Sequence, residues 1–362
     1  MRILHTEWSD GLGGQEKRVL AELSGLSGRG HDLCLVCRPD ARIRAEAERA
    51  GIGVFPLPLK SPLDLASILK LRTILKEQGI EIVNTHSGVD SWIGSLAAKL
   101  GGVPLLVRTR HLNIPLRRSL LNFVHYLPDL YITCGENMRS TLVNQSGFPG
   151  NRVVSIPTGV SGEFFDVARD GGAKRAFGLE PSALVITNVG ILRRVKGHEI
   201  MFRAVPDVVR EFPQARFLVV GDGPRRAELE RMADDLAIGE YVTFTGFIED
   251  IRGVYTCTDV AVLSSWSEGL PQSVLQALAC AVPVVATRVG GVPEVVKHEK
   301  TGFLAEPGDH GGLAREIIRV LREPEKAYQT ALAGRELVRK DHSVERMLDQ
   351  LEQLYAGLLG QR

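Results

Sequence analysis

Residues 259–287 read DVAVLSSWSEGLPQSVLQALACAVPVVAT and contain a strand, a loop, a helix, a turn and a second strand. The apolar runs Val260–Leu263 and Val282–Ala286 predict the two strands, and Ser273–Cys280 predicts the helix between them. Pro271 stands at the first helical turn, where its missing backbone N–H would have no helical partner anyway. Short apolar strands separated by a helix are typical of a parallel sheet that is covered on both faces.

The same alternation extends in both directions along the chain. The further predicted strands are Arg2–His5, Asp32–Cys37, Ile80–Asn84, Leu105–Thr109, Leu130–Thr133, Leu184–Val189, Arg216–Val220 and Tyr241–Phe244. The further predicted helices are Gln15–Ser27, Asp64–Gln78, Ser91–Lys99, Glu199–Glu211, Arg226–Leu236, Leu313–Leu321 and Ser343–Leu359. Two such sets of strands predict an α/β protein with two doubly wound domains. Ligands of these sheets bind beyond the carboxyl ends of the strands, so polar residues at those ends are the candidate sites.

Length and composition agree with a globular protein of two domains. The chain has 362 residues, of which 44% are hydrophobic and 24% are charged, and these shares argue against disorder and coiled coil. No apolar run approaches the ~18–20 residues of a membrane span, and the N-terminus has no signal-peptide core. We therefore expect a cytoplasmic protein. Five cysteines make a disulfide framework unlikely in this setting, and the pair Cys34 and Cys37 predicts buried thiols rather than a metal site.

The charge is balanced overall but uneven along the chain. The net charge of +1 gives no case for nucleic-acid binding. Residues 1–160 carry 19 Lys and Arg against 14 Asp and Glu, whereas the remainder is acidic. A basic half beside an acidic half favours an anionic partner for the first half. The polar stretch Val160–Gly172 predicts a domain junction within 159–178, and a new helix is expected near Ala173.

A glycine-rich turn follows the first strand at Asp10–Gly14, DGLGG. Glycines at such a place let the backbone approach a phosphate, and the following helix N-terminus offers free N–H groups. A nicotinamide fingerprint would need a third glycine where Glu16 stands, so that class of cofactor is not indicated. A plain tight turn remains the alternative interpretation.

Two histidines stand at strand ends in the first half. His86 follows a buried strand in IVNTHS, and His111 follows LLVRTR. Both positions face the ligand edge of a parallel sheet, so the two together indicate a polar crevice. A satisfied structural role remains open for His86.

The segment GILRRVKGH, at Gly190–His198, brings cations to a strand-to-helix junction in the second half. Arg193, Arg194 and Lys196 beside a helix N-terminus would suit a diphosphate. Solvated loop charges are the alternative.

Glu268 lies in the loop of the opening segment, at the carboxyl end of a strand, and Gln276 follows eight positions later. Were the interval helical, the two residues would be ~12 Å apart, too far for the ~5–9.5 Å carboxyl pair of a glycosidase, and Gln276 cannot act as a carboxylate. Glu268 therefore indicates a ligand-positioning residue, with a solvated glutamate as the alternative. The Gly-Gly turn in Ala286–Val296 is expected to be structural, and no carboxylate cluster suggests a metal.

Taken together, these residues resemble the retaining glycosyltransferase family 4, over essentially the whole chain. The most specific part is SEGLPQSVLQALACAVPVVATRVGGVPEVV, followed by HEKTGFLAEPGD at 298–309. Further matching segments are VVSIPTGV at 153–160, VVGDGP at 219–224 and VTFTGF at 242–247. The resemblance implies the GT-B fold, in which two Rossmann-like domains face a central crevice and the C-terminal helix crosses back to the first domain. The domains it implies are 1–163 with 343–362 on the acceptor side, and 164–342 for the nucleotide sugar.

The resemblance also implies a role for each matching residue. Lys196 would neutralise the donor diphosphate, with Arg193 or Arg194 beside it. Glu268 would hold the sugar hydroxyls together with the Gly269 and Leu270 backbone. Gln276 would contact the ribose, Gly14 would approach the donor phosphate, and His86 would contact the transferred sugar. Gly13 and His111 are expected on the acceptor side.

Two positions depart from the family pattern. The second glutamate of the family's E-x7-E motif is replaced by Gln276, whose amide can still bond ribose hydroxyls. Ile191 stands where the family often has an arginine. The expected donor is a UDP-sugar, with a GDP-sugar second, and no cofactor or metal is expected.

The acceptor is expected to be a lipid-linked or cell-envelope polysaccharide glycan. Asp64–Gln78 and Pro115–Tyr126 are apolar on one side and basic on the other, which suits peripheral contact with an anionic membrane at its inner face. Ordinary core-facing helices are the alternative. Two other functions stay open: a GT-B nucleotide-sugar epimerase or hydrolase, and a non-catalytic nucleotide-sugar-binding protein.

Overall fold

The computed structural model describes residues 1–116, 119–168 and 170–361. The chain forms two compact units, each with its own sheet. The N-terminal unit comprises Met1–Gly159 and Val344–Arg362, and the C-terminal unit comprises Val160–Ser343. The structure thus divides the chain between Gly159 and Val160, a few residues before the boundary expected after residue 163.

The N-terminal unit contains a seven-stranded parallel sheet with strand order β3-β2-β1-β4-β5-β6-β7. Its strands are β1 (Arg2–Glu7), β2 (Asp32–Cys37), β3 (Gly53–Pro56), β4 (Ile82–Thr85), β5 (Leu105–Arg110), β6 (Leu130–Thr133) and β7 (Val153–Ser155). Its helices include α1 (Gly14–Gly28), α2 (Arg42–Arg49), α3 (Leu65–Glu77), α4 (Gly88–Gly101), α5 (Glu136–Ser140) and the 3₁₀-helix η1 (Leu120–Tyr126). Each face of the sheet buries its own apolar cluster, so every central strand is covered on both sides.

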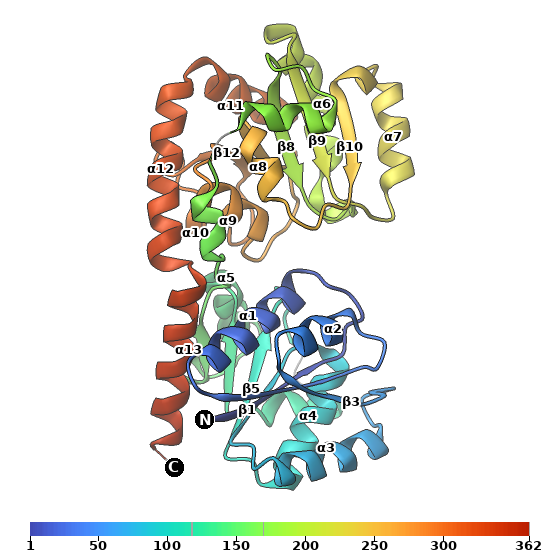
Figure 1. The fold of residues 1–362 in the computed structure, drawn as a ribbon, viewed down its shortest axis with the longest axis vertical. Helices are drawn as coiled ribbons and strands as arrows, with labels where there is room; N and C mark the ends of the chain where they lie inside the picture. Colours follow the sequence, from blue (N-terminus) through green and yellow to red (C-terminus); the bar gives the residue numbers. More distant parts are fainter. Residues whose placement is uncertain (117–118, 169, 362) are drawn as a thin grey trace. The chain divides into compact units, whose positions relative to one another are not determined.

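The last helix, α13 (Val344–Leu359), belongs to the N-terminal unit although it follows the C-terminal unit in sequence (Figure 1). Its residues Met347, Leu348, Leu351 and Tyr355 are buried in the apolar cluster that also holds the core of α1. The helix that was expected to return to the first domain does so.

The C-terminal unit contains a six-stranded parallel sheet with strand order β10-β9-β8-β11-β12-β13. Its strands are β8 (Leu184–Val189), β9 (Ala215–Val220), β10 (Val242–Gly246), β11 (Val260–Leu263), β12 (Val284–Thr287) and β13 (Phe303–Ala305). Its helices are α6 (His198–Glu211), α7 (Arg226–Asp235), α8 (Arg252–Cys257), α9 (Gln272–Ala279), α10 (Val292–Val295), α11 (His310–Arg322) and α12 (Pro324–Asp341), beside short 3₁₀ turns. One apolar cluster joins α6, α7 and α11 to the sheet, and another joins α9, α10 and α12.

Every strand and helix expected from the apolar patterns is present, with its ends shifted by no more than three residues. The sequence pattern missed β3, β7 and β13, which have only three or four residues and each form an edge of a sheet. Such short edge strands lack the long buried run that marks a central strand.

Two local expectations were wrong in detail. Pro115–Tyr126 is not one regular helix: its described part ends in η1, whose helical geometry is broken at Asn122, and Arg117 and Arg118 lie outside the described residues. The turn near Ala173 is a 3₁₀-helix, Gly171–Phe177, rather than the start of an α-helix.

Candidate functional site

The candidate residues collect where the strand order of each sheet reverses. In the C-terminal unit β8 lies between β9 and β11, and the loops after β8 and β11 carry Lys196 and Glu268. In the N-terminal unit β1 lies between β2 and β4. Gly14 begins α1, which follows β1, and His86 lies in the loop after β4. A crevice at such a switch point is the usual ligand site of a doubly wound sheet.

Lys196 and Glu268 form an ion pair at the edge of the C-terminal sheet. The Nζ of Lys196 lies 2.7 Å from Oε1 of Glu268, and the Ser265 hydroxyl donates to the same oxygen at 2.5 Å. The Glu268 side chain is only 9% exposed, so the carboxylate is held in one place rather than solvated. The sequence analysis proposed both residues for the donor site. It did not predict the contribution of Ser265, because a single serine there gives no separate motif.

The glycine pair after β12 packs directly against the loop that carries Glu268. Gly290 has φ +50°, and a Cβ there would stand 1.8 Å from the carbonyl oxygen of Glu268. Its neighbour Gly291 donates its N–H to the carbonyl of Gly269 at 2.8 Å. The Gly-Gly turn has the structural role that was expected, because only residues without a Cβ allow this close backbone contact with the loop of Glu268.

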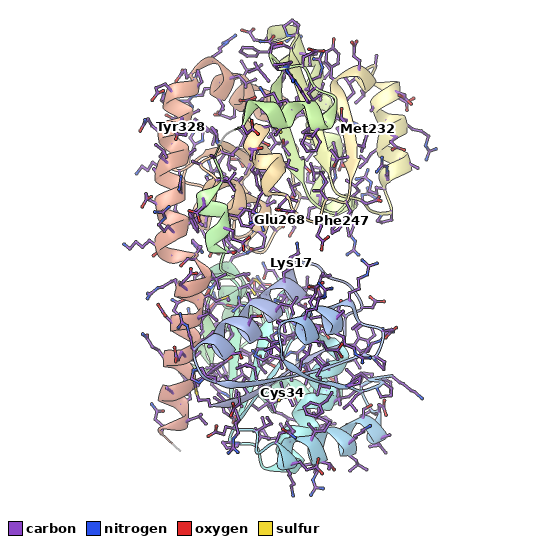
Figure 2. All side chains as sticks on the ribbon, viewed as in Figure 1. Lys17, Cys34, Met232, Phe247, Glu268 and Tyr328 are labelled. Atoms are coloured by element: carbon purple, nitrogen blue, oxygen red, sulfur yellow. The ribbon has the colours of Figure 1, made fainter. Side chains whose placement is uncertain are left out.

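A second polar group, which the sequence did not reveal, ties three loops of this edge together. Trp266 Nε1 donates to Oε1 of Glu199 at 2.8 Å, and Oε2 of Glu199 pairs with Arg225 at 2.8 Å. Trp266 follows β11, Glu199 begins α6 after β8, and Arg225 follows β9. In Figure 2, Glu268 and Phe247 lie along the same edge of this unit.

The remaining donor-side residues lie around this pair. Gln276 is half-buried on α9, and Gly269 and Leu270 lead into the N-terminus of that helix. Ile191, Arg193 and Arg194 are exposed in the loop after β8. The positive dipole end of α9 together with Lys196 makes this edge suited to an anion.

In the N-terminal unit the glycine-rich turn leads into α1. Gly13 is the N-cap, and its N–H donates to the Glu16 carboxylate at 2.7 Å. A Cβ built on Gly14 meets nothing within 4 Å, so open space lies beside its backbone. Glu7 at the end of β1 braces this turn by accepting from the Ser9 N–H at 2.9 Å and the Gln15 amide at 2.7 Å. Burial, and then the nearby charge of Asp90, raise the pKa of Glu7 to about 8.

His86 belongs to a chain of three histidines. Its Nε2 lies 2.9 Å from Nδ1 of His5, and its Nδ1 lies 3.0 Å from Nε2 of His111. His111 Nδ1 is in turn 3.5 Å from the Cys134 sulfur. Burial lowers the pKa of His5, and it lowers the pKa values of His86 and His111 well below the ordinary value, so the chain is neutral near pH 7. His86 is 3% exposed with both ring nitrogens engaged, so a direct bond to a sugar would have to replace one of these contacts.

Among the described residues, one group of side chains has ligand atoms close enough together to hold a metal ion, and it includes two of the three histidines. Ligand atoms of His5, Glu22 and His86 lie within 4.8 Å of one another. The Glu22 carboxylate already pairs with the buried guanidinium of Arg18 at 2.7 Å. A permanent cation beside the ligand set disfavours a second cation, so these residues do not fit a metal ion.

Two other features lie apart from the site. Cys34 and Cys37 pack in the clusters on opposite faces of the N-terminal sheet, and burial raises the pKa of both thiols.

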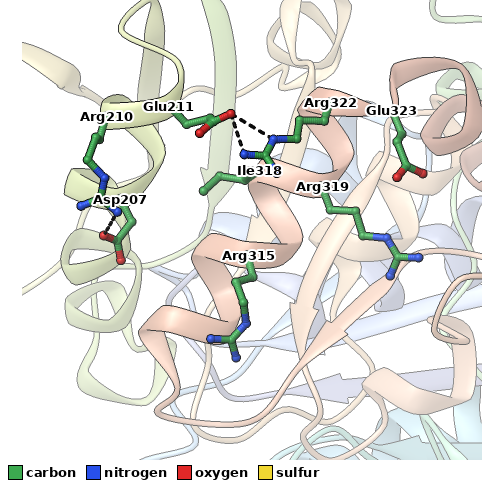
Figure 3. A pocket seen from close by; sticks show the side chains of 8 residues that line it. All are labelled: Asp207, Arg210, Glu211, Arg315, Ile318, Arg319, Arg322 and Glu323. Atoms are coloured by element: carbon green, nitrogen blue, oxygen red, sulfur yellow. Dashed lines mark hydrogen bonds and ion pairs between the residues drawn. The ribbon is translucent and has the colours of Figure 1, made fainter.

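A pocket of about 430 Å³ lies between α6 and α11 (Figure 3). Paired charges line it, such as Arg322 with Glu211 and Arg210 with Asp207. It adjoins the C-terminal ends of both helices, away from the edge that carries Lys196.

The fold agrees with the comparisons to known proteins. Residues 12–164 match the model described as Glycosyltransferase Family 4, and residues 183–323 match the model described as Glycosyl transferases group 1. Two parallel Rossmann-like units with these matches define a glycosyltransferase of the GT-B class. The chain is therefore a GT-B glycosyltransferase whose first half is similar to glycosyltransferase family 4.

Individual relatives support the same conclusion. The chain is 26% identical over 316 residues to N-acetyl-alpha-D-glucosaminyl L-malate synthase of Bacillus anthracis, covering 85% of this chain and 82% of that protein. It is 24% identical over 378 residues to UDP-Gal:alpha-D-GlcNAc-diphosphoundecaprenol alpha-1,3-galactosyltransferase of Escherichia coli, covering 99% and 97%. The crystal structure of Anabaena Alr3699/HepE in complex with UDP matches the fold with a TM-score of 0.87 at 20% identity, covering 99% of this chain and all of that one.

The helices were also compared with the requirements of a membrane span. In the parts of the chain that the structure describes, no helix is both long and apolar enough to cross a bilayer.

Proposed function

We propose that the protein transfers a sugar from a UDP-sugar, with retention at the anomeric carbon, to a hydroxyl of a lipid-linked or cell-envelope glycan. The observation that carries this proposal is the Lys196–Glu268 pair beside the N-terminus of α9, at the switch point of the C-terminal sheet. A GDP-sugar is the second candidate donor. Support for the first comes from the relative that uses UDP-Gal and from the similar fold that binds UDP.

The C-terminal unit supplies the groups that the reaction needs on the donor. Breaking the sugar–phosphate bond leaves negative charge on the diphosphate, and Lys196, Arg193 and the α9 N-terminus would stabilise that charge as it develops. Glu268 would accept hydrogen bonds from the sugar hydroxyls, with the Gly269 and Leu270 backbone beside it. Gln276 would bond the ribose. The leaving phosphate can take the proton of the acceptor hydroxyl, so no protein nucleophile is required.

The N-terminal unit supplies the acceptor side of the proposal. We assign Gly14 to the donor phosphate, His86 to the transferred sugar, and Gly13 and His111 to the acceptor side. Because both nitrogens of His86 are already bonded to histidines, its part in the reaction includes holding His111 in place.

Peripheral contact with an anionic membrane is part of the same proposal. The α3 region exposes Leu63, Leu65 and Leu69, which are 64%, 69% and 58% exposed, and Lys60 and Lys70 are exposed near them. Apolar side chains flanked by lysines suit the surface of an anionic leaflet. Sedimentation with phosphatidylglycerol vesicles is expected, and equal binding to phosphatidylcholine vesicles would argue against an electrostatic contact.

The experiment that tests the donor is a thermal-shift screen against UDP, GDP, ADP, CMP and dTDP. A ligand at about 100 times its dissociation constant stabilises the folded state by ~2.7 kcal/mol, so a selective shift identifies the base. We expect UDP to give the largest shift and the Lys196→Ala variant to lose most of it. No shift with any nucleotide or intact nucleotide sugar would contradict the transferase proposal.

A transfer assay then distinguishes the reaction classes. We expect release of UDP to depend on added acceptor. Conversion or hydrolysis of the sugar without any acceptor would instead indicate an epimerase or hydrolase. Donor binding without turnover, together with activity gained in a Gln276→Glu variant, would indicate a non-catalytic binder.

A further inference from the structure

Arg108 and Arg110 on β5 carry two positive charges on one face of the N-terminal sheet. They alternate with Thr109, so both side chains point to the face that also buries Leu106. Arg108 is 2% exposed and Arg110 is half-buried. Both therefore hold guanidinium groups largely out of water, which is costly unless an anion compensates the charge.

Their partners in the structure are all neutral. Arg108 donates from Nη1 to Nδ1 of His125 at 2.6 Å. Arg110 donates from Nη2 to the carbonyl oxygens of Leu112 at 3.4 Å and Ile114 at 2.8 Å. The Nε atoms of both arginines are buried and have no hydrogen-bond partner among the described residues. Among the residues that the structure describes, no carboxylate lies within 4.0 Å of either guanidinium.

Arg18 in the same unit shows the ordinary solution for a buried arginine. It is 1% exposed, and its Nε donates to the Glu22 carboxylate at 2.7 Å. Arg108 is as deeply buried, but its partners are the neutral side chains of His125 and Tyr131, and its Nε has no partner among the described residues. The difference is a missing negative charge, since buried charges in proteins are normally paired.

The electrostatics of the neighbours agree with an uncompensated cation pair. Burial, and then the charge of Arg108, lower the pKa of Arg110 to about 10. Burial, and then the charges of Arg108 and Arg110, lower the pKa of His125 to about 4, so this imidazole is neutral near pH 7. The cluster thus holds two positive charges that the described residues around it do not balance.

The chain that follows β5 exposes four large apolar or aromatic side chains among its described residues. Its exposed large side chains are Leu112 (64%), Ile114 (57%), Phe123 (45%) and Tyr126 (40%). Phe123 packs edge-on against Trp92 of α4, with ring centroids 5.4 Å apart, so part of this surface is anchored. Cations beside exposed apolar side chains fit a ligand with a charged head and a hydrocarbon chain.

We propose that Arg108 and Arg110 bind the phosphate or diphosphate group of a lipid-linked acceptor, whose hydrocarbon chain contacts the exposed apolar side chains after β5. Guanidinium groups bind phosphate oxygens through paired, charge-assisted hydrogen bonds, and two adjacent arginines match a diphosphate. The identity of this ligand as the acceptor rests on the proposed function, whereas the anion site itself does not.

The test is calorimetric titration with farnesyl diphosphate, a short lipid diphosphate, in the presence of saturating UDP to occupy a donor diphosphate site. The Arg110→Gln variant is expected to raise the dissociation constant at least about tenfold, the factor for losing one charge-assisted hydrogen bond. The matched control is Arg139→Gln, since Arg139 in this unit already pairs with Glu136 at 2.7 Å, and its dissociation constant should stay within about twofold of wild type. Unchanged binding in Arg110→Gln, or no binding by the wild-type protein, would overturn the proposal.

Two further measurements separate a binding role from a structural one. Arg110→Gln removes an uncompensated charge, so its melting temperature should be equal to or above that of wild type; a large drop with unchanged affinity would assign the arginine to stability alone. Arg108→Lys keeps the positive charge of the more buried residue but loses the planar guanidinium group. This variant should therefore also bind farnesyl diphosphate more weakly than wild type.

Two comparison ligands identify the source of the phosphate. Inorganic pyrophosphate should bind at least about tenfold more weakly than farnesyl diphosphate, because it buries no hydrocarbon. Equal affinity for the two would overturn the lipid part of the proposal. The nucleotide screen is independent of this titration: loss of farnesyl diphosphate binding in Arg110→Gln, with no nucleotide bound by the wild type, would support the anion site and refute the transferase.

Discussion

At the scale of single residues, the Glu268 carboxylate is organised asymmetrically. Lys196 and Ser265 both bond to Oε1, and no hydrogen bond from a described residue reaches Oε2. One oxygen therefore fixes the side chain while the other is available to accept a ligand hydroxyl. This arrangement agrees with the proposed role of Glu268 in positioning the sugar.

Replacing Glu268 by alanine is expected to lower the rate of sugar transfer at least ~100-fold, the scale for losing a positioned transition-state contact. The rate is measured as UDP release under saturating donor. The control is Glu249→Ala, an exposed glutamate in the loop after β10, which should retain the wild-type rate. Near-normal activity in Glu268→Ala would remove this residue from the reaction.

His198 illustrates a buried titratable group with an effect on stability. It is fully buried at the start of α6, neither ring nitrogen has a partner in the described part of the chain, and burial lowers its pKa from 6.5 to about 4. Below pH 6.5 the unfolded chain takes up a proton that the folded protein cannot, so stability falls as the pH falls. Between pH 6.5 and 5 this one group costs about 2 kcal/mol of unfolding free energy.

The His198→Leu variant should lack this acid sensitivity. Urea unfolding at pH 7, 6 and 5 is expected to show a smaller loss of stability for the variant than for wild type, by about 2 kcal/mol at pH 5. The raised pKa of Glu7 acts with the opposite sign but is common to both proteins, so it cancels in the comparison. Parallel pH profiles would show that the His198 ring is protonated in the folded state.

At the scale of secondary-structure elements, turns and loops carry the site while strands and helices hold them in place. The loop after β11 is supported from β12 by the Gly-Gly turn and from α6 by the Trp266–Glu199 bond. Because the supports come from elements distant in sequence, a change in one turn is expected to act on a residue that it does not adjoin in the chain.

The Gly290→Ala variant tests that coupling. Its φ of +50° and the contact with the Glu268 carbonyl leave no room for a Cβ, so we expect a loss of ~1–3 kcal/mol in stability together with reduced transfer. The control is Gly253→Ala on α8, where a Cβ meets nothing within 4 Å and stability should hold or rise. Equal stability of both variants in urea would refute the role of the turn.

At the scale of the whole molecule, the final helix completes a unit begun more than three hundred residues earlier. Leu351 and Tyr355 of α13 are fully buried in the N-terminal core, and Arg29 links α1 to Glu352 at 3.0 Å. The N-terminal unit is therefore incomplete until the last residues of the chain have been added.

The Leu351→Ala variant is expected to destabilise the protein by ~2–5 kcal/mol, the range for truncating a fully buried leucine. Denaturant unfolding followed by circular dichroism measures the loss. The control is Gln353→Ala, an exposed neighbour on the same helix, which should change stability by less than ~0.5 kcal/mol. A small effect of Leu351→Ala would mean that α13 is dispensable to the N-terminal core.

The sequence alone determined the two parallel sheets, because their central strands are buried on both faces and read as continuous apolar runs. It also singled out Lys196 and Glu268 at two strand ends, and the fold joins them in one ion pair. Ligand roles for Gly14 and His86 stay predictions. The short edge strands were missed because three or four residues are too few to form such a run.

Only the tertiary structure decided which side chains meet across those loops. The Lys196–Glu268 pair, the Trp266–Glu199–Arg225 contacts and the three-histidine chain each join residues that are far apart in sequence. The missing counter-charge at Arg108 and Arg110 is likewise invisible in a sequence, because pairing depends on what folds within a few ångströms. Local patterns reflect burial along one strand or helix, whereas charge balance and hydrogen bonding depend on distance in space.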